Sequence, residues 1–336
     1  MTGRQSSVAK LVLAAMLTAA PVAEPALAYQ KYGVMAGDRF VILKWQRFPI
    51  RYYVSDRGVP GVSADQLRAA VARAFQAWTS APGTDLRVDF VGFTAAPPLD
   101  EDGLSTLGFL DRPELDRVLG ATEYLIDTVT GEILESDIFF NTSFSWSVAD
   151  SGEAGRFDLE SIAVHEIGHF LGLGHSAIGE TELIASGGRR VIASQSVMFP
   201  IAFSPGSITD RTLKADDIAG IGDIYPNDDF RRGTGTIGGR ITKGGQAVFG
   251  AHILAFNPRT GKLVGNFSFD DGRFAIAGLD PGPHIIRVEP VDDADLDSFF
   301  SDADDVDIDF RVTFLDRLAI VPERGSTTAD VSVERK

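Results

Sequence analysis

An α+β domain followed by an all-β sandwich is the fold class that this sequence of 336 residues predicts. Strand-like runs alternate with helical periodicity between residues 49 and 225, whereas no strong helical periodicity follows residue 236. The intervening stretch 226–236, "PNDDFRRGTGT", is rich in proline, glycine and charge. The length supports two cores of ordinary size, so we expect two domains.

The first domain opens with "PIRYYV" (49–54), a run typical of a strand. A capping-box pair, Ser63 and Gln66, then precedes a helix of about four turns. Its apolar residues recur at helical spacing: Leu67, Val71, Phe75 and Trp78. Three more strand-like runs and two more helices complete the domain, with strands expected at 86–91, 121–127 and 132–140, a helix from about Asp158 as N-cap, and a helix at 213–225.

The second domain, 237–336, alternates short β-rich runs with glycine and asparagine turns, which predicts a β-sandwich. His252 and His284 lie in these runs without metal-ligand spacing, so we expect packing or surface roles for them. Nine aspartates crowd residues 292–309. They could bind calcium, but the glycine and terminal glutamate of an EF-hand loop are missing, which favours a solvated acidic loop.

Residues 1–28 have the features of a secretory signal peptide: Arg4 and Lys10, an apolar run, and the small-residue cleavage pattern at 26–28. A membrane anchor is the alternative, but the apolar run 11–23 has about 13 residues and a span needs roughly 20. We therefore expect a secreted protein, extracellular or periplasmic, with no membrane span after cleavage.

Net charge limits the classes of binding partner, and cysteine content limits how the fold can be stabilised. The formal net charge of −16 opposes binding to nucleic acid. The sequence has no cysteine, so disulfides cannot stabilise it and packing or a metal must do so. Nothing in the sequence indicates an oligomeric state.

Three of the five histidines stand within "HEIGHFLGLGH", residues 165–175. On a helix, His165 and His169 share one face with a rise of about 6 Å between them. Gly172 permits a sharp turn, which would bring His175 back toward the same ion. Three imidazoles with the fourth tetrahedral corner left to water are typical of catalytic zinc, whereas closed structural sites are rich in cysteine.

Glu166, next to the first histidine, is placed to accept a proton from that water and to pass it to the departing amine. The pattern predicts a zinc metalloendopeptidase that hydrolyses peptide bonds without a covalent intermediate. The alternative is an accidental cluster on a surface helix. Five specified residues at fixed spacing make that alternative weak.

The pattern His-Glu-x-x-His-x-x-Gly-x-x-His, followed by Ser176, resembles the metzincin signature in its matrixin branch. "SVMFP" (196–200) is similar to the methionine turn of that family, and the likeness covers roughly residues 40–226. The resemblance implies a small twisted mixed sheet with three helices, one catalytic Zn²⁺, Met198 beneath the metal and Pro200 beside the specificity pocket. It also implies protein or peptide substrates bound in extended form, for which "GATEYLID" (120–127) is the candidate edge strand.

The departures from the family pattern concern metals and latency. No histidine precedes His165, so the second, structural zinc of animal matrixins cannot be built in the same way. Phe139 stands in place of one of its ligands, and Asn141 stands where a calcium-binding aspartate is expected, which leaves a calcium requirement undecided. The cysteine that commonly keeps the family latent is missing.

The second domain resembles carboxypeptidase regulatory-like, transthyretin-like domains, through "GGRITKGGQAVFGAHILAFNPRTGK" and "DDGRFAIAGLDPGPHIIRV". The expected organisation is a signal peptide at 1–28, a matrixin-like peptidase domain at 29–226, a linker at 227–236 and this β domain at 237–336. A rival interpretation is a surface- or partner-binding protein that uses the zinc domain as a scaffold. Glu166 argues against it, because a structural site needs no base. Another metzincin branch is disfavoured by Ser176 and by the lack of glycine-aspartate repeats.

Overall fold

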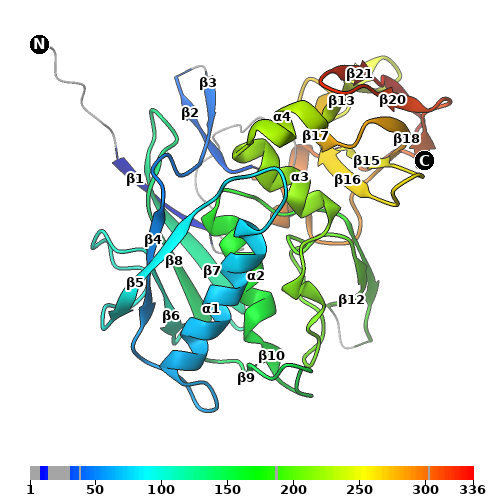
Figure 1. The fold of residues 1–336 in the computed structure, drawn as a ribbon. Coiled ribbons are helices and arrows are strands. Elements are labelled where there is room, and N and C mark those ends of the chain that lie inside the picture. The colour runs from blue at the N-terminus through cyan, green and yellow to red at the C-terminus, as the bar shows by residue number, and fades with distance from the viewer. Residues whose placement is uncertain (1–7, 14–30, 38, 186–187, 302) are drawn as a thin grey trace, which may run out of the picture.

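The computed structural model describes residues 8–13, 31–37, 39–185, 188–301 and 303–336 (Figure 1). Most of the predicted signal peptide, at 1–7 and 14–28, therefore lies outside the described residues. Among the residues that are described, no helix is long and apolar enough to cross a membrane.

The N-terminal half contains a six-stranded mixed sheet in the order β1-β7-β8-β6-β4-β5. The pairs β8-β6, β6-β4 and β4-β5 are parallel, whereas β7 is antiparallel to both of its neighbours. This is the small mixed sheet that the sequence predicts. Its strands are β1 Val8–Leu13, β4 Ile50–Ser55, β5 Val88–Thr94, β6 Thr106–Leu110, β7 Gly120–Asp127 and β8 Ile133–Asn141.

The expectation that 120–127 forms an edge strand is wrong for the full chain. β1, which belongs to the predicted signal peptide, pairs with β7 in register from Val8↔Asp127 to Leu13↔Thr122. An unpaired strand edge presents a row of N–H and C=O groups that any extended segment can satisfy. Cleavage after residue 28 would remove β1 and leave this edge of β7 open.

Three helices accompany the sheet, as predicted: α1 Ala64–Thr79, α2 Leu159–Phe170 and α3 Ala215–Ile224. The Ser63 and Gln66 capping box is formed at the start of α1, and Asp158 caps α2. α1 and α2 pack on each other and against the sheet, α1 over β4 and β5 and α2 over β7 and β8 (Figure 1). His165 and His169 are therefore carried by a helix packed directly on the core.

Shorter elements surround this core. They are the hairpin β2 Gly33–Ala36 and β3 Arg39–Ile42, the parallel pair β9 Trp146–Ser147 and β10 Phe157–Asp158, the hairpin β11 Gly179–Leu183 and β12 Arg189–Ser194, and the 3-10 helix η1 Thr209–Arg211.

The segment 227–236, predicted as a linker, is largely structured. It forms helix α4, Asp228–Gly233, whose N-cap Asn227 accepts a hydrogen bond from Phe230 N. The Phe230 ring is in contact with three glycines, one upstream of α4, one in α3 and one in the C-terminal region, Gly83, Gly222 and Gly278. Proline, glycine and charge indicated a domain boundary with a linker, and in the structure the capping Asn227 and the Phe230 ring fix this segment between both halves.

The C-terminal region is all-β apart from two short 3-10 helices among its described residues, and it forms two five-stranded sheets. One sheet consists of β13 Gly235–Lys243, β14 Gln246–Ala247, β17 Arg273–Leu279, β21 Ser326–Thr328 and β22 Val331–Val333. The other consists of β15 His252–Phe256, β16 Leu263–Phe267, β18 Gly282–Glu289, β19 Thr313–Phe314 and β20 Ala319–Val321. The 3-10 helices are η2 Leu296–Ser298 and η3 Ala303–Asp305.

One buried apolar cluster runs through both halves, from Leu43 in the N-terminal part to Val333 in the last strand. α3 makes the junction, because it packs against β16 and β17 (Figure 1). The resemblance of the C-terminal sheets to carboxypeptidase regulatory-like domains stays a prediction.

Candidate metal centre

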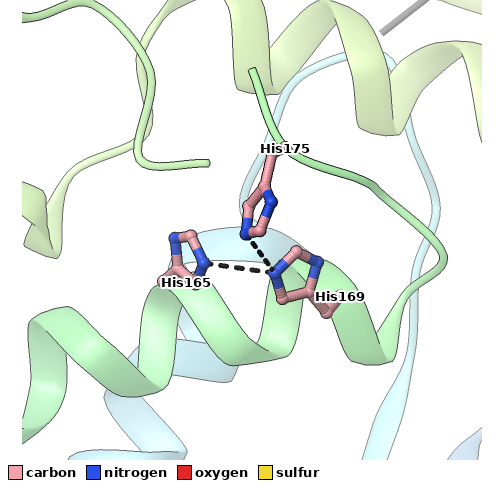
Figure 2. Close-up of side chains that lie close together, drawn as sticks. All are labelled: His165, His169 and His175. Carbon is pink, nitrogen blue, oxygen red and sulfur yellow. Dashed lines mark hydrogen bonds between the residues drawn. The ribbon is translucent and has the colours of Figure 1, made fainter. Parts of the chain in front are cut away.

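Helix α2 places His165 and His169 one turn apart on the same face (Figure 2). The helix begins where Asp158 accepts a hydrogen bond from Ser161 N at 2.9 Å, which satisfies one of the free N–H groups of the first turn. Arg211 neutralises the same carboxylate at 2.6 Å. The first two predicted ligands thus sit on a helix whose start is fixed by a buried ion pair.

Gly172 ends this helix and returns the chain toward it. Its φ is +96°, a conformation that side-chain-bearing residues avoid. A Cβ there would lie 2.4 Å from the carbonyl oxygen of Leu43, so there is also no space for one. His175 then approaches the two helical histidines from the other side, as Figure 2 shows. The turn that the sequence predicts at Gly172 is confirmed.

The three Nε2 atoms converge. His169 Nε2 lies 3.1 Å from that of His165 and 3.2 Å from that of His175, and all three ligand atoms lie within 4.8 Å of one another. Nitrogens bonded to a tetrahedral zinc at about 2.0–2.1 Å are about 3.3–3.4 Å apart. The two distances at His169 are close to this value, and the three residues could hold such an ion. Among the described residues, no other histidine, cysteine or carboxylate group of three or more comes this close together.

Each ring is oriented by a backbone carbonyl on its other nitrogen. Nδ1 of His165, His169 and His175 lies 2.7, 2.8 and 2.7 Å from the carbonyls of Val197, Leu173 and Ser298, respectively. A carbonyl can only accept, so Nδ1 must carry the proton and Nε2 must present its lone pair. Three lone pairs therefore face one point, which is the arrangement that a metal ion needs.

The lowered pKa values of the three histidines also disfavour protonation of their rings. Desolvation lowers the pKa of His165, lowers that of His169 well below the ordinary value, and lowers that of His175 to about 3. The neighbouring imidazoles add to the effect at His169 and His175. The three histidines are neutral at pH 7, so no proton has to be displaced before a cation binds.

Glu166 follows His165 on α2. The residue is buried, and Thr122 Oγ1 on β7 lies 2.9 Å from Oε2 and donates to it. Burial raises the pKa of the Glu166 carboxyl to about 8, while the Thr122 bond acts in the opposite direction. A carboxylate whose proton affinity is raised by burial is a stronger base than an exposed one.

Met198 lies under the helix that carries the ligands. It is 2% exposed, and its sulfur packs so closely on Gly168 of α2 that a Cβ there would lie 2.2 Å away. Asp217 of α3 holds the turn before it by accepting from Ser196 Oγ at 2.5 Å and Val197 N at 3.0 Å. Met198 therefore lies against the helix that carries His165 and His169, and its place beneath a metal ion stays a prediction. Pro200 follows at the partly exposed end of this turn, and its place beside a specificity pocket stays a prediction.

Four residues at this centre escaped the sequence analysis. Thr122 holds Glu166, the Tyr124 hydroxyl donates to the His169 carbonyl, Asp217 holds the turn of Met198, and the Ser298 carbonyl orients His175. Thr122 and Tyr124 lie in the strand predicted at 121–127, and Asp217 lies in the helix predicted at 213–225, but nothing in the sequence indicated their contacts with this centre. Ser298 lies in no predicted element.

An α+β domain with three converging histidines and a buried carboxyl next to the first of them is the arrangement of a zinc metalloprotease. The family described as Matrixin matches residues 44–226, more than half of the chain, and the chain belongs to that family. The family implies zinc as the metal.

The relatives are metalloproteinases of plants and animals. The chain is 28% identical over 206 residues to Metalloendoproteinase 1-MMP of Arabidopsis thaliana, a match that covers 56% of this chain and 46% of that protein. It is 30% identical over 178 residues to Metalloendoproteinase 1 of Glycine max, covering 48% of this chain and 46% of that protein. Matrix metalloproteinase-20 of Homo sapiens is 29% identical over 133 residues, covering 40% of this chain and 25% of that protein. The chain thus spans less than half the length of these relatives.

Solved structures give only weak matches. The minor pilin GBS52 of Streptococcus agalactiae matches 31% of this chain and 45% of its own, with 9% identity and a TM-score of 0.21. A likeness of this size supports no conclusion about the C-terminal sheets.

Proposed function

We propose that this chain is a secreted zinc-dependent metalloendopeptidase in which Glu166 is the general base. The observation that carries the proposal is the convergence of three neutral histidine nitrogens beside a buried carboxyl, in a member of the matrixin family. The proposed organisation is a signal peptide at 1–28, a catalytic domain at 29–226 and an accessory β domain at 237–336, joined by 227–236.

His165, His169 and His175 would hold the zinc ion through Nε2. When bound, zinc lowers the pKa of a water to about 7 and polarises a carbonyl group. Glu166 would act as the general base toward such a water and then as the general acid toward the departing amine. Thr122 engages one carboxyl oxygen, Oε2, and leaves Oε1 free for this proton transfer. The backbone carbonyls of Val197, Leu173 and Ser298 hold the three rings so that each Nε2 lone pair would point at the ion.

The proposed substrate is a protein or peptide bound in extended form along the outer edge of β7. The antiparallel pairing of β1 with this edge supports the proposal, because the same N–H and C=O groups become available once residues 1–28 are removed. Met198 would support the zinc site from beneath, and Pro200 would lie beside the specificity pocket. The net charge of −16 opposes nucleic acid as a partner.

The test compares the wild-type protein with Glu166→Ala on a proteome-derived peptide library, with and without a chelator. We expect chelator-sensitive cleavage by the wild type, and a loss of about 10²–10⁴-fold in Glu166→Ala with stoichiometric zinc retained. Equal cleavage by both proteins would overturn the role of Glu166. A wild-type protein that binds zinc but cleaves nothing would support the rival, a binding protein on a zinc-bearing scaffold.

A further inference from the structure

A stretch of the C-terminal region, residues 291–300, packs against the segment that carries the third histidine. Its apolar side chains share one buried cluster with residues that follow His175 and Met198. The contributors from the C-terminal stretch are Val291, Ala294, Phe299 and Phe300, and those from the catalytic half are Ala177, Val191 and Phe199. We call residues 291–300 the docking segment.

Polar contacts fix the docking segment at its start. The Asp293 carboxylate accepts from Thr181 N at 2.7 Å, and the Thr181 hydroxyl donates to the Asp293 carbonyl at 2.8 Å. The aspartates of this stretch are therefore not all solvated, because this one joins the C-terminal region to the hairpin β11-β12.

Near its end the docking segment forms the 3-10 helix η2, Leu296–Ser298, which sets the direction of the Ser298 carbonyl. Ser298 N donates to the Asp295 carbonyl at 2.9 Å, and Phe299 N donates to that of Leu296 at 2.9 Å. With the turn held in this way, the Ser298 carbonyl lies 2.7 Å from His175 Nδ1.

The third histidine differs from the other two in where its acceptor comes from. His169 uses Leu173, only four residues away, and His165 uses Val197 in the turn of Met198, both within residues 44–226. His175 depends on Ser298, 123 residues further along the chain, beyond the catalytic half. Without that carbonyl its buried Nδ1–H would lose its partner, and the ring would be free to turn or to change tautomer.

We propose that the docking segment is a positioning element of the zinc centre, which orients His175 through the Ser298 carbonyl and so couples zinc affinity to the C-terminal region. This rests on the proposed zinc site. Groups that hold a ligand histidine from behind typically contribute 10–100-fold to metal affinity. The C-terminal region is then a part of the active centre and more than an appended module.

The test replaces Ser298 by proline in the full chain. Proline at 298 removes the N–H that bonds Asp295 and forces Asp297 out of helical geometry, so η2 opens and the carbonyl moves away. Asp305→Pro is the matched control, because Asp305 is the exposed third residue of η3 in the same acidic stretch. Zinc dissociation constants are measured on metal-stripped protein by competition with a chromophoric chelator, together with the visible absorption spectrum of the Co²⁺-loaded protein.

We expect Ser298→Pro to weaken zinc binding by at least tenfold and to alter the Co²⁺ spectrum, and Asp305→Pro to stay within twofold of wild type. A folded Ser298→Pro protein with wild-type zinc affinity and Co²⁺ spectrum would overturn the proposal. If Ser298→Pro does not fold, Asp293→Ala decides, with Asp293→Asn as its control because asparagine keeps an acceptor for Thr181 N. Unchanged zinc affinity in Asp293→Ala then overturns it. These results do not depend on peptide cleavage, so a wild type that binds zinc without cleaving peptides defeats the proposed function alone.

Discussion

Gly172 has both a backbone and a spatial reason to be glycine. With φ at +96°, an alanine would be strained by about 1–2 kcal/mol, and its Cβ would also meet the Leu43 carbonyl at 2.4 Å. We expect Gly172→Ala to lower the free energy of unfolding by more than about 3 kcal/mol and to weaken zinc binding, because the turn sets the position of His175.

Gly155 provides the control for that prediction. Its φ is +78°, but a Cβ there would meet nothing within 4 Å. Gly155→Ala therefore isolates the backbone strain, about 1 kcal/mol, and should leave zinc binding unchanged. Chemical denaturation of the two variants measures the difference. Equal losses of stability would show that the Leu43 contact at Gly172 relaxes without cost.

We expect Thr122 to orient Glu166, the proposed general base. Its hydroxyl donates to Glu166 Oε2 at 2.9 Å from the neighbouring strand β7. Thr122→Val keeps the shape but removes the donor, so the carboxyl loses one of its fixed orientations. We expect a decrease of about tenfold in kcat with zinc affinity unchanged, since a hydrogen bond to a charged group contributes about 1.5–3 kcal/mol. Thr122→Ser, which retains the hydroxyl, should restore most of the rate, and a valine variant as fast as wild type would contradict the role.

The sequence predicted the three histidines that converge in the structure, but not the residues that orient them, for a physical reason. His165, His169, Gly172 and His175 follow from helical geometry and a glycine turn, which are local properties of eleven residues. Ser298 contributes only its carbonyl, which every residue has, so no side-chain pattern can reveal it. Such contacts become visible only when the chain is folded.

At the scale of elements, the C-terminal end of α2 is held by donors from two other segments. A helix leaves its last carbonyls without intrahelical partners. Here Trp45 Nε1 donates to the Phe170 carbonyl at 2.8 Å, and the Tyr225 hydroxyl donates to that of Leu171 at 2.8 Å. The helix therefore ends rigidly next to the turn at Gly172, which keeps the first two ligands in place relative to the third.

Helix α3 connects the ligand segment to the C-terminal sheet through a buried carboxyl. Asp216 accepts from Ser176 Oγ at 2.7 Å and from Gly265 N of β16 at 2.9 Å. Burial, reinforced by the charge of Asp217, raises the pKa of Asp216 from 3.8 to about 7. A folded-state pKa above the unfolded value gives stability that is complete below about pH 4 and is lost as the pH rises through 7.

Asp216→Asn should remove this pH dependence. The asparagine oxygen can accept from Gly265 N and its amide can donate to the Ser176 hydroxyl, so both contacts persist. We expect the variant to match the wild type at about pH 4 and to be more stable by about 2–4 kcal/mol at pH 8. Urea denaturation of both proteins at the two pH values measures the difference. A variant that is less stable than wild type at both would show that the charged form of Asp216 is favoured in the fold.

The elements that the sequence predicted and those that it did not differ in how they are specified. α1, α2 and α3 combine a cap or charge at the start with periodic apolar residues, which are local signals. Strand β6 is short, mostly buried and interrupted by Gly108, so it shows no alternation and is defined by its neighbours β4 and β8. Helix α4 was not predicted, because its segment has a composition typical of linkers, although Asn227 is a residue type favoured as an N-cap.

At the scale of the whole molecule, the two halves share one core. The main buried cluster contains residues from both, and Phe230 of α4 packs on glycines of each. The docking segment adds a second cluster across the same junction. The sequence predicted two domains with separate cores because composition and periodicity change at 226–236. Composition cannot show that α3 packs on β16 and β17.

We therefore expect the chain to unfold in a single transition that zinc displaces as a whole. A ligand at 1,000 times its dissociation constant stabilises the folded state by about 4 kcal/mol. If the halves share a core and the Ser298 contact, removal of zinc lowers the unfolding temperature of both together, because neither half can stay folded at the junction alone. Differential scanning calorimetry with and without a chelator, combined with near-ultraviolet circular dichroism for the aromatic residues, measures this. Two transitions, of which only one responds to the chelator, would show that the halves fold independently and that the contacts at α3, α4 and the docking segment are weak.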